Sequence, residues 1–212
     1  STADWSTFNG KQGAITLTTT GTSGASTLIG NTLNIPQYAA GLTYFTETQN
    51  TAAPNATVYV DSLTAVSAVT NTDIAIIPKG TGAILAAIPD GTATGGNKRG
   101  ANAIDLQTAR TSAARVASGA NSVVLGGVDS GATGQYGIAG GNGAQANNTG
   151  AIAFGTAVTA SGLSAIALGN SSTAGGNYAV SIGQSNTASN ANSVAIGYNN
   201  TASTAQNVAI GY

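Results

Sequence analysis

Asn192-Ser-Val-Ala-Ile-Gly197 recurs in close copies along the C-terminal part of the 212-residue chain. The copies share a final glycine, and the series runs Gly126, Gly141, Gly155, Gly169, Gly183, Gly197, Gly211. The first step in the series is fifteen residues long and every later step is fourteen. A fixed repeat of this length predicts a solenoid, in which each repeat forms one coil that its neighbours stabilise.

Two large apolar residues, separated by one small residue, precede most of these glycines. Before Gly197 they are Val194 and Ile196, with Ala195 between them. This alternation predicts a short strand whose successive side chains point to opposite faces. We expect the large pair to be stacked inward, with the polar residues facing water or sister chains.

A second, shorter strand or corner is predicted after each glycine. Five residues beyond the glycines, from Gly141 on, lie Ala146, Ala160, Ala174, Ala188 and Ala202. Each large buried side chain contributes about 1.5–3 kcal/mol, which barely offsets the cost of ordering a whole coil. We therefore expect coils to stack on one another and three chains to associate.

One copy departs from the pattern. Gly140 occupies the position where the other copies have a large apolar residue, and Tyr136 and Gly137 precede it. The sequence therefore predicts that this coil is irregular.

The N-terminal part alternates in the way that strands do and shows no helical periodicity. Turn residues separate strand-like stretches at residues 14–20, 27–35, 42–48, 57–60, 73–77 and 82–88. We expect an all-β chain with a β module over residues 1–50, a second β-rich segment over 51–97, a connector over 98–117 and the repeat domain over 118–212.

The connector concentrates charge among alanines. Its ionisable residues, with Lys98 at its start, are Lys98, Arg99, Asp105, Arg110 and Arg115. Two structures remain open for residues 104–117, a short helix and an extended strand exchanged between chains. The pattern favours a structural role, in which Arg99 or Arg110 pairs with Asp105 of the same or a neighbouring subunit. A binding role is the alternative.

Composition excludes several classes of function. Only 6% of residues are charged, the net charge is -1, and no charged residue follows Asp129. Nucleic-acid and anionic-membrane binding need clustered Lys and Arg, so both are disfavoured. The chain has no Cys, Met or His, which removes thiol chemistry, imidazole bases and soft metal ligands. No apolar run is long enough for a membrane helix, so no membrane insertion is expected.

The sequence predicts no enzyme, and no catalytic, cofactor-binding or metal-binding residue. Glu47 is the only glutamate, so a pair of catalytic carboxylates would have to form across subunits. The glycine-rich residues 137–143 lack the Gly-Lys-Ser/Thr ending of a phosphate-binding loop, which favours turns. Candidate contacts to host glycans are Tyr178, Tyr198, Asn199 and Asn200; a merely solvated face is the alternative.

The repeated Asn-Ser-Val-Ala-Ile-Gly segment, with Ala and Ser about five residues on, resembles the head repeats of trimeric autotransporter adhesins. This resemblance covers residues 118–212 and implies a left-handed parallel β-roll assembled as a homotrimer. The same repeat occurs in bacteriophage tail fibres. Further segments resemble parts of phage tail and fibre proteins: residues 4–11, 31–38, 78–82, 95–107 and 116–122.

Together, the resemblances favour a structural tail fibre or appendage of a phage virion, a trimeric shaft that supports attachment to a host cell. Its expected partners are two further copies of the chain, other virion proteins and a host-surface glycan or receptor. The alternative is a bacterial surface adhesin of the trimeric autotransporter type. A free-standing extracellular filament subunit is the third reading.

Overall fold

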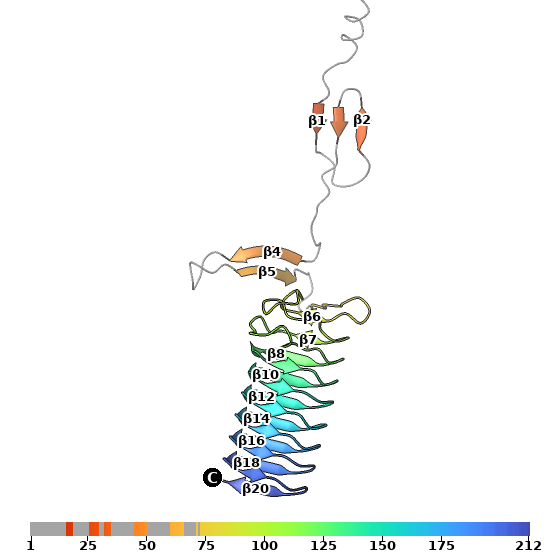
Figure 1. Cartoon of the computed structure of the whole chain (residues 1–212). Helices are drawn as coiled ribbons and strands as arrows, with labels where there is room; N and C mark the ends of the chain where they lie inside the picture. The colour runs from red at the N-terminus through yellow and green to blue at the C-terminus, as the bar shows by residue number, and fades with distance from the viewer. Residues whose placement is uncertain are drawn as a thin grey trace, which may run out of the picture. The chain divides into compact units, whose positions relative to one another are not determined.

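The computed structural model describes residues 73–212 without a gap and, before them, residues 16–18, 26–29, 32–34, 45–50, 60–65 and 71. The chain divides into two compact units, residues 1–75 and 76–212. Every regular element among the described residues is a β-strand (Figure 1), which confirms the all-β prediction. The division predicted at residues 50, 97 and 117 stays a prediction.

The described residues of the first unit form the short strands β1 (Thr16–Thr18), β2 (Thr27–Ile29), β3 (Thr32–Asn34), β4 (Phe45–Asn50) and β5 (Val60–Ala65). β3 pairs in parallel with β1 and antiparallel with β2, and β4 and β5 form an antiparallel pair. The single strand expected over residues 27–35 is therefore wrong. Two antiparallel strands replace it, because that pairing sets Leu28 opposite Leu33.

The second unit is a parallel β-solenoid built from two sheets, with one long and one short strand in each regular coil (Figure 1). The nine-stranded sheet contains β6 (Ile84–Leu85), β7 (Ile104–Asp105), β8 (Val123–Val128), β10 (Ile138–Asn142), β12 (Ile152–Thr156), β14 (Ile166–Asn170), β16 (Val180–Gln184), β18 (Val194–Tyr198) and β20 (Val208–Gly211). The six-stranded sheet contains β9 (Gly131–Ala132), β11 (Gln145–Ala146), β13 (Thr159–Ala160), β15 (Thr173–Ala174), β17 (Thr187–Ala188) and β19 (Thr201–Ala202). The predicted fourteen-residue coils and the second short strand are both confirmed.

Strand register places the repeated glycines directly above one another. Gly155 pairs with Gly169, and Gly169 with Gly183. At the start of the series, however, Gly141 pairs with Gly127, and the register between β8 and β10 shifts at that point. The glycine series therefore begins at Gly127, and the prediction that it begins at Gly126 is wrong. A bulge in β8 accommodates the extra residue of the first, fifteen-residue step.

These glycines are required for two independent reasons. Gly169 has a φ of 117°, in the left-handed half of the map that side chains disfavour. A Cβ added to Gly169 would also lie 2.0 Å from the carbonyl oxygen of Gly183 in the next coil. The backbones of consecutive coils therefore approach at a place where no side chain fits.

The interior of the solenoid is lined by small side chains. The middle residues of the long strands and the alanines of the short strands are fully buried: Ala139, Ala153, Ala167, Ser181 and Ala195, with Ala146, Ala160, Ala174, Ala188 and Ala202. The large pairs, such as Val194 and Ile196, point the other way and are partly exposed. The expectation that they stack inward is wrong, because a coil of fourteen residues brings its two sheets too close together for large side chains.

The coil that contains Gly140 is irregular toward β8, as predicted, because the register shifts there between Ala139 and Gly141, whereas it is regular toward the next coil. β10 pairs with β12 without a register shift, and Gly140 lies opposite Phe154. A Cβ at Gly140 would lie 2.6 Å from Cε1 of Phe154. The aromatic ring therefore occupies the space that the missing side chain leaves, so the two residues compensate for each other in volume.

Three segments near the start of the second unit differ from expectation. Residues 73–77 form no strand, and of residues 82–88 only Ile84–Leu85 is a strand. Residues 104–117 form neither a helix nor a long strand, because after β7 the chain continues through turns with only single bridges to the next coil, from Ala109 to Val128 and from Ala117 to Ala132. This segment is held by polar contacts, which are described below, and not by regular strand pairing.

Replacing Gly169 by alanine should destabilise the solenoid by more than about 3 kcal/mol, because both the positive φ and the neighbouring carbonyl oppose a Cβ. Gly175 provides the matched control, since its nearest neighbour to an added Cβ lies 3.7 Å away. Gly175→Ala should cost less than about 1 kcal/mol. Thermal unfolding followed by circular dichroism at one protein concentration checks both values, and equal melting temperatures would contradict this account of the glycines.

Gly140→Ala should cost about 1–3 kcal/mol, because the new methyl group overlaps the ring of Phe154. In a Phe154→Leu background the same substitution should be nearly neutral, since leucine already occupies the equivalent place in the next coil at Leu168. A double-mutant cycle on unfolding free energies should give a coupling of at least about 1 kcal/mol. Additive effects would show that the two residues do not share this space.

Candidate functional site

The outer face of the nine-stranded sheet is a continuous apolar strip, here called the apolar face. Its first row is Ile84, Ile104, Val123, Ile138, Ile152, Ile166, Val180, Val194 and Val208, which the strand register places one above the other. The second row is Leu106, Leu125, Phe154, Leu168, Ile182, Ile196 and Ile210, with Gly140 in the gap. Both rows run the length of the solenoid.

Among residues 76–212, the side chains of the apolar face cover one another and no other segment is seen to cover them. In the middle coils these residues are partly buried against the coils above and below. At the last strand, which has one neighbour, Val208 and Ile210 are 59% and 68% exposed. An apolar strip of this extent on a soluble surface marks an interaction site.

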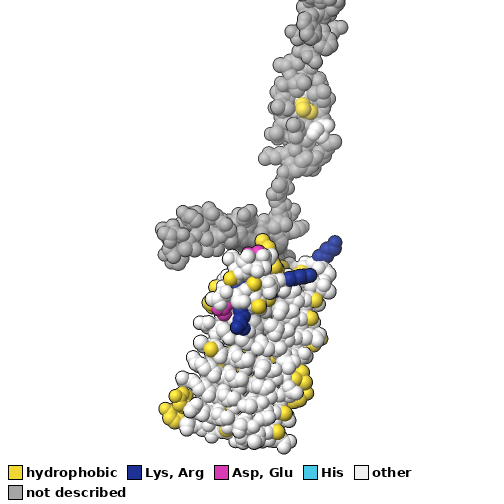
Figure 2. Space-filling model, viewed as in Figure 1, with side chains coloured by type: hydrophobic (Ala, Val, Ile, Leu, Met, Phe, Trp, Pro, Cys, Tyr) yellow, Lys and Arg dark blue, Asp and Glu magenta, His cyan; other side chains and the backbone are white. Residues whose placement is uncertain are grey.

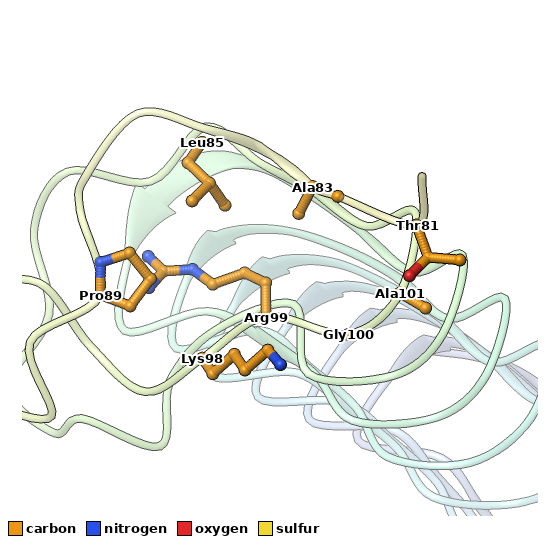
Figure 3. Close-up of a pocket in the computed structure, with 9 residues that line it drawn as sticks. Thr81, Ala83, Leu85, Pro89, Lys98, Arg99, Gly100 and Ala101 are labelled. Atoms are coloured by element: carbon orange, nitrogen blue, oxygen red, sulfur yellow. The ribbon is translucent and has the colours of Figure 1, made fainter. Parts of the chain in front are cut away.

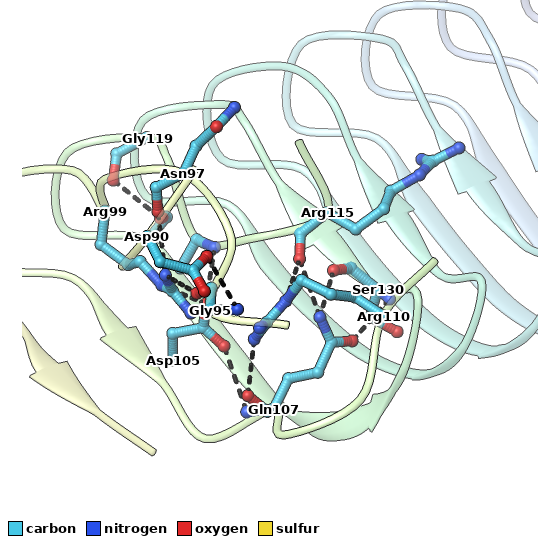
Figure 4. Close-up of polar contacts among 12 residues, drawn as sticks. Asp90, Gly95, Asn97, Arg99, Asp105, Gln107, Arg110, Arg115, Gly119 and Ser130 are labelled. Carbon is cyan, nitrogen blue, oxygen red and sulfur yellow. Dashed lines mark hydrogen bonds and ion pairs between the residues drawn. The ribbon is translucent and has the colours of Figure 1, made fainter. Parts of the chain in front are cut away.

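A buried ion pair closes the N-terminal end of the solenoid (Figure 4). Nε of Arg99 donates to Oδ2 of Asp105 at 2.7 Å, and both side chains are buried. Nη1 of Arg99 donates to the carbonyl oxygens of Gly95 and Asn97 at 2.6 and 2.8 Å. The predicted pairing of Arg99 with Asp105 is confirmed, and both residues belong to the same chain.

Gln107 and Arg110 extend this network to the neighbouring loops (Figure 4). Oε1 of the fully buried Gln107 accepts from the N–H of Ser130 at 2.7 Å, and its Nε2 donates to the carbonyl oxygen of Arg115 at 2.8 Å. Arg110 donates to the carbonyl oxygens of Thr94 and Gln107. Arg110 therefore stabilises loops, and the alternative in which it pairs with Asp105 is wrong because backbone carbonyl oxygens accept the hydrogen bonds that its guanidinium donates. We call Arg99, Asp105, Gln107 and Arg110 the polar cap.

The carboxylates of Asp129, which is partly buried, and Asp90, which is exposed, hold the loops around the polar cap through hydrogen bonds. The hydroxyl of Thr111 donates to Oδ2 of Asp129 at 2.6 Å, and its backbone N–H donates to Oδ1. These bonds, with the charge of Arg115, hold the pKa of Asp129 below its ordinary 3.8. The backbone N–H and hydroxyl of Thr92 lower the pKa of Asp90 in the same way. A carboxylate whose pKa is lower in the folded protein than in the unfolded chain stabilises the fold at pH values above its ordinary pKa. Both contacts therefore persist at mildly acidic pH, and they are lost only as the pH falls through the lowered pKa values.

A cleft of about 500 Å³ lies beside the polar cap (Figure 3). Its lining residues are Thr81, Gly82, Ala83, Leu85, Pro89, Lys98, Arg99, Gly100 and Ala101. Nη2 of Arg99 is buried there and has no acceptor among the described residues. The lining includes cations and a hydroxyl but no carboxylate or imidazole, so it provides no acid–base pair.

The four glycan-contact candidates have different surroundings. Asn200 donates to the carbonyl oxygens of Ile196 and Gly211, so its amide serves the fold. Tyr198 stacks on Tyr212 with ring centroids 5.4 Å apart. Asn199 occupies a turn with a φ of 56°, and Tyr178 is 55% exposed in a different turn. The structure does not bring Tyr178 and Tyr198 together.

The sequence analysis did not predict that asparagine side chains connect one coil to the next by hydrogen bonds. The fully buried Asn186 donates to the carbonyl oxygens of Ile182 and Gly197 at 2.9 and 2.6 Å and accepts from the N–H of Asn200. The recurrence of Asn at the same place in two successive coils was the available signal.

Within the described residues, no three potential metal-ligating side chains gather in one place. No helix in that part of the chain has the length and hydropathy to cross a membrane.

Comparison with protein families identifies the repeats. Residues 132–157, 160–186 and 188–212 match the YadA head domain repeat. No curated protein and no solved structure matches the chain. The C-terminal part of the chain therefore carries YadA head domain repeats that form a β-solenoid.

Asp105→Ala should lower the stability of the protein by about 3–5 kcal/mol, because it leaves the guanidinium of Arg99 buried without its counter-ion. The exposed Lys98 offers a matched control in the same segment, and Lys98→Ala should change stability by less than about 0.5 kcal/mol. Melting temperatures of the two variants check the difference. Unchanged melting of the Asp105 variant would show that the cap does not hold the end of the solenoid.

Proposed function

We propose that this protein is a non-enzymatic, extracellular fibrous protein of the adhesin type that acts as a homotrimer. The observation that carries the proposal is the apolar face, a strip of aliphatic side chains that runs along the whole solenoid. A single chain leaves this strip open to water. Three chains around one axis would bury it along the fibre and protect it from unspecific association.

The match to YadA head domain repeats supports this proposal. Heads of this kind are surface-exposed and generally trimeric. The distribution of charge agrees, because no Lys, Arg, Asp or Glu follows Asp129, and none is seen over the later coils on the face shown in Figure 2. Such a surface permits many weak, identical contacts along a fibre, and their combined avidity exceeds that of any one contact.

Two biological settings fit such a fibre. The repeats favour a bacterial surface adhesin of the trimeric autotransporter type. The N-terminal segments that resemble phage tail proteins support a tail fibre or appendage of a virion, with other virion proteins as partners. Gold-labelled antibodies against the repeat domain, applied to intact bacterial cells and to purified phage particles, distinguish the two: each setting requires labelling of its own particle.

Light scattering on the purified chain should give a mass three times that of the monomer. Ile182→Lys should abolish this trimer, because it places a charge in the middle of the apolar face. Thr173→Lys is the matched control, since Thr173 points outward from the six-stranded sheet next to the buried Ala174. A stable monomer of the unsubstituted chain, or a trimer that survives Ile182→Lys, would contradict the proposal.

A further inference from the structure

From the coil of β8 onward, one turn of each coil contains a residue with a left-handed backbone at the same position. These residues are Asn121, Tyr136, Gly150, Ser164, Tyr178, Asn192 and Gln206, with φ between 50° and 67°. Each lies just before a long strand, at one edge of the nine-stranded sheet. The turn is therefore a constant feature of the coil, while its side chain varies.

Hydrogen bonds between coils lock this backbone conformation. The N–H of Tyr136 donates to the carbonyl oxygen of Ala120 at 3.0 Å, and that of Tyr178 donates to the carbonyl oxygen of Leu163 at 2.8 Å. Equivalent bonds hold Gly150 and Ser164. The turn cannot adopt another conformation without breaking the contact between coils, so whichever residue occupies it has to tolerate a positive φ.

Tyrosine is poorly suited to this position. Glycine and asparagine populate the left-handed region readily, whereas a bulky side chain there is an outlier. Nevertheless, Tyr136 and Tyr178 are 54% and 55% exposed, so burial of the rings within the chain does not offset the strain. Strained residues that the fold does not need are concentrated at functional sites.

The two tyrosines frame a stretch of small residues. Gly150 and Ser164 occupy the two coils between them. At the usual spacing of paired strands, three coils separate the rings by about 14 Å along the axis. The neighbouring turn residues Gln135 and Thr149 are exposed and supply an amide and a hydroxyl for hydrogen bonding.

We propose that Tyr136 and Tyr178, with the hydroxyls and the amide between them, bind an uncharged oligosaccharide that lies along the edge of the solenoid. Tyrosine offers a large, rigid, amphipathic contact at low entropic cost, with a ring that packs on the C–H face of a sugar and a hydroxyl that bonds to it. The ligand is uncharged because no ionisable side chain other than tyrosine lies in residues 130–212. This inference deepens the proposed role in attachment and rests on it.

The experiment measures binding of the full chain to immobilised dextran, mannan and galactan by surface plasmon resonance, with the polyanion hyaluronan for comparison. We expect binding to at least one neutral polysaccharide and none to hyaluronan. The double variant Tyr136→Asn/Tyr178→Asn should bind at least about tenfold more weakly. Its melting temperature should be unchanged or higher, because asparagine accepts a positive φ.

Tyr198→Asn is the control, since Tyr198 lies at the end of a long strand and stacks on Tyr212; it should bind like the unsubstituted chain. Binding to none of the neutral polysaccharides, or equal binding by the double variant, would overturn the inference. A lower melting temperature or loss of the trimer in the double variant would also overturn it, by showing that the tyrosines are contacts between chains. The trimer mass, measured on the same samples, separates failure of this site from failure of the proposed function.

Discussion

The close approach of the backbone in consecutive coils is the constraint on which the rest of the structure depends. Each coil of fourteen residues pairs with the next in register, and at Gly155, Gly169 and Gly183 the carbonyl oxygen of the following coil lies where a Cβ would be. A side chain at these positions would push two coils apart and break every hydrogen bond of the pair. The spacing of these glycines along the sequence therefore equals the number of residues in one coil. It restricts the length of a coil more strictly than any apolar position does.

The short distance between the two sheets of a coil also determines where the large side chains lie. Its interior accepts Ala, Ser and occasionally Val, as the full burial of Ala153, Ala160 and Val158 shows. Most large aliphatic residues then lie on the outer face of the long strands, where they stack along the solenoid. A single chain thus has an interior too small to provide much hydrophobic stabilisation, together with an apolar exterior that it cannot cover. Folding and association are for this reason expected to depend on the same residues, which distinguishes such a solenoid from a globular domain whose core is complete before it assembles.

Much of the fold follows from the sequence because the repeat is local and regular. The coil length, the two strands and the small residue at Ala146 and its equivalents could all be predicted from spacing. The direction in which the large side chains point could not be predicted from the sequence. An alternation of period two defines two faces of a strand, but which face lies inside depends on the distance between the two sheets. Gly140 illustrates a second limit, since the ring of Phe154 that fills its place lies one coil away. The partner of Arg99 was predictable from charge scarcity, whereas Gln107 and Arg110 bind backbone oxygens that no sequence pattern marks.

The N-terminal end of the solenoid contains its charged residues, and the later coils contain none. The charged groups of the solenoid gather at its N-terminal end, where Arg99 and Asp105 supply polar contacts to coils that have few regular strand pairs. Beyond Asp129 the coils stabilise one another, so charges are no longer needed there. The positions that remain free to vary are those with side chains on neither the apolar face nor the interior, and they include the left-handed turns, where Tyr136 and Tyr178 are more than half exposed. Since the hydrogen bonds between coils fix the backbone of these turns, their side chains can change without altering the fold. A protein built in this way can acquire binding residues one coil at a time, at regular heights along a surface that is otherwise uniform.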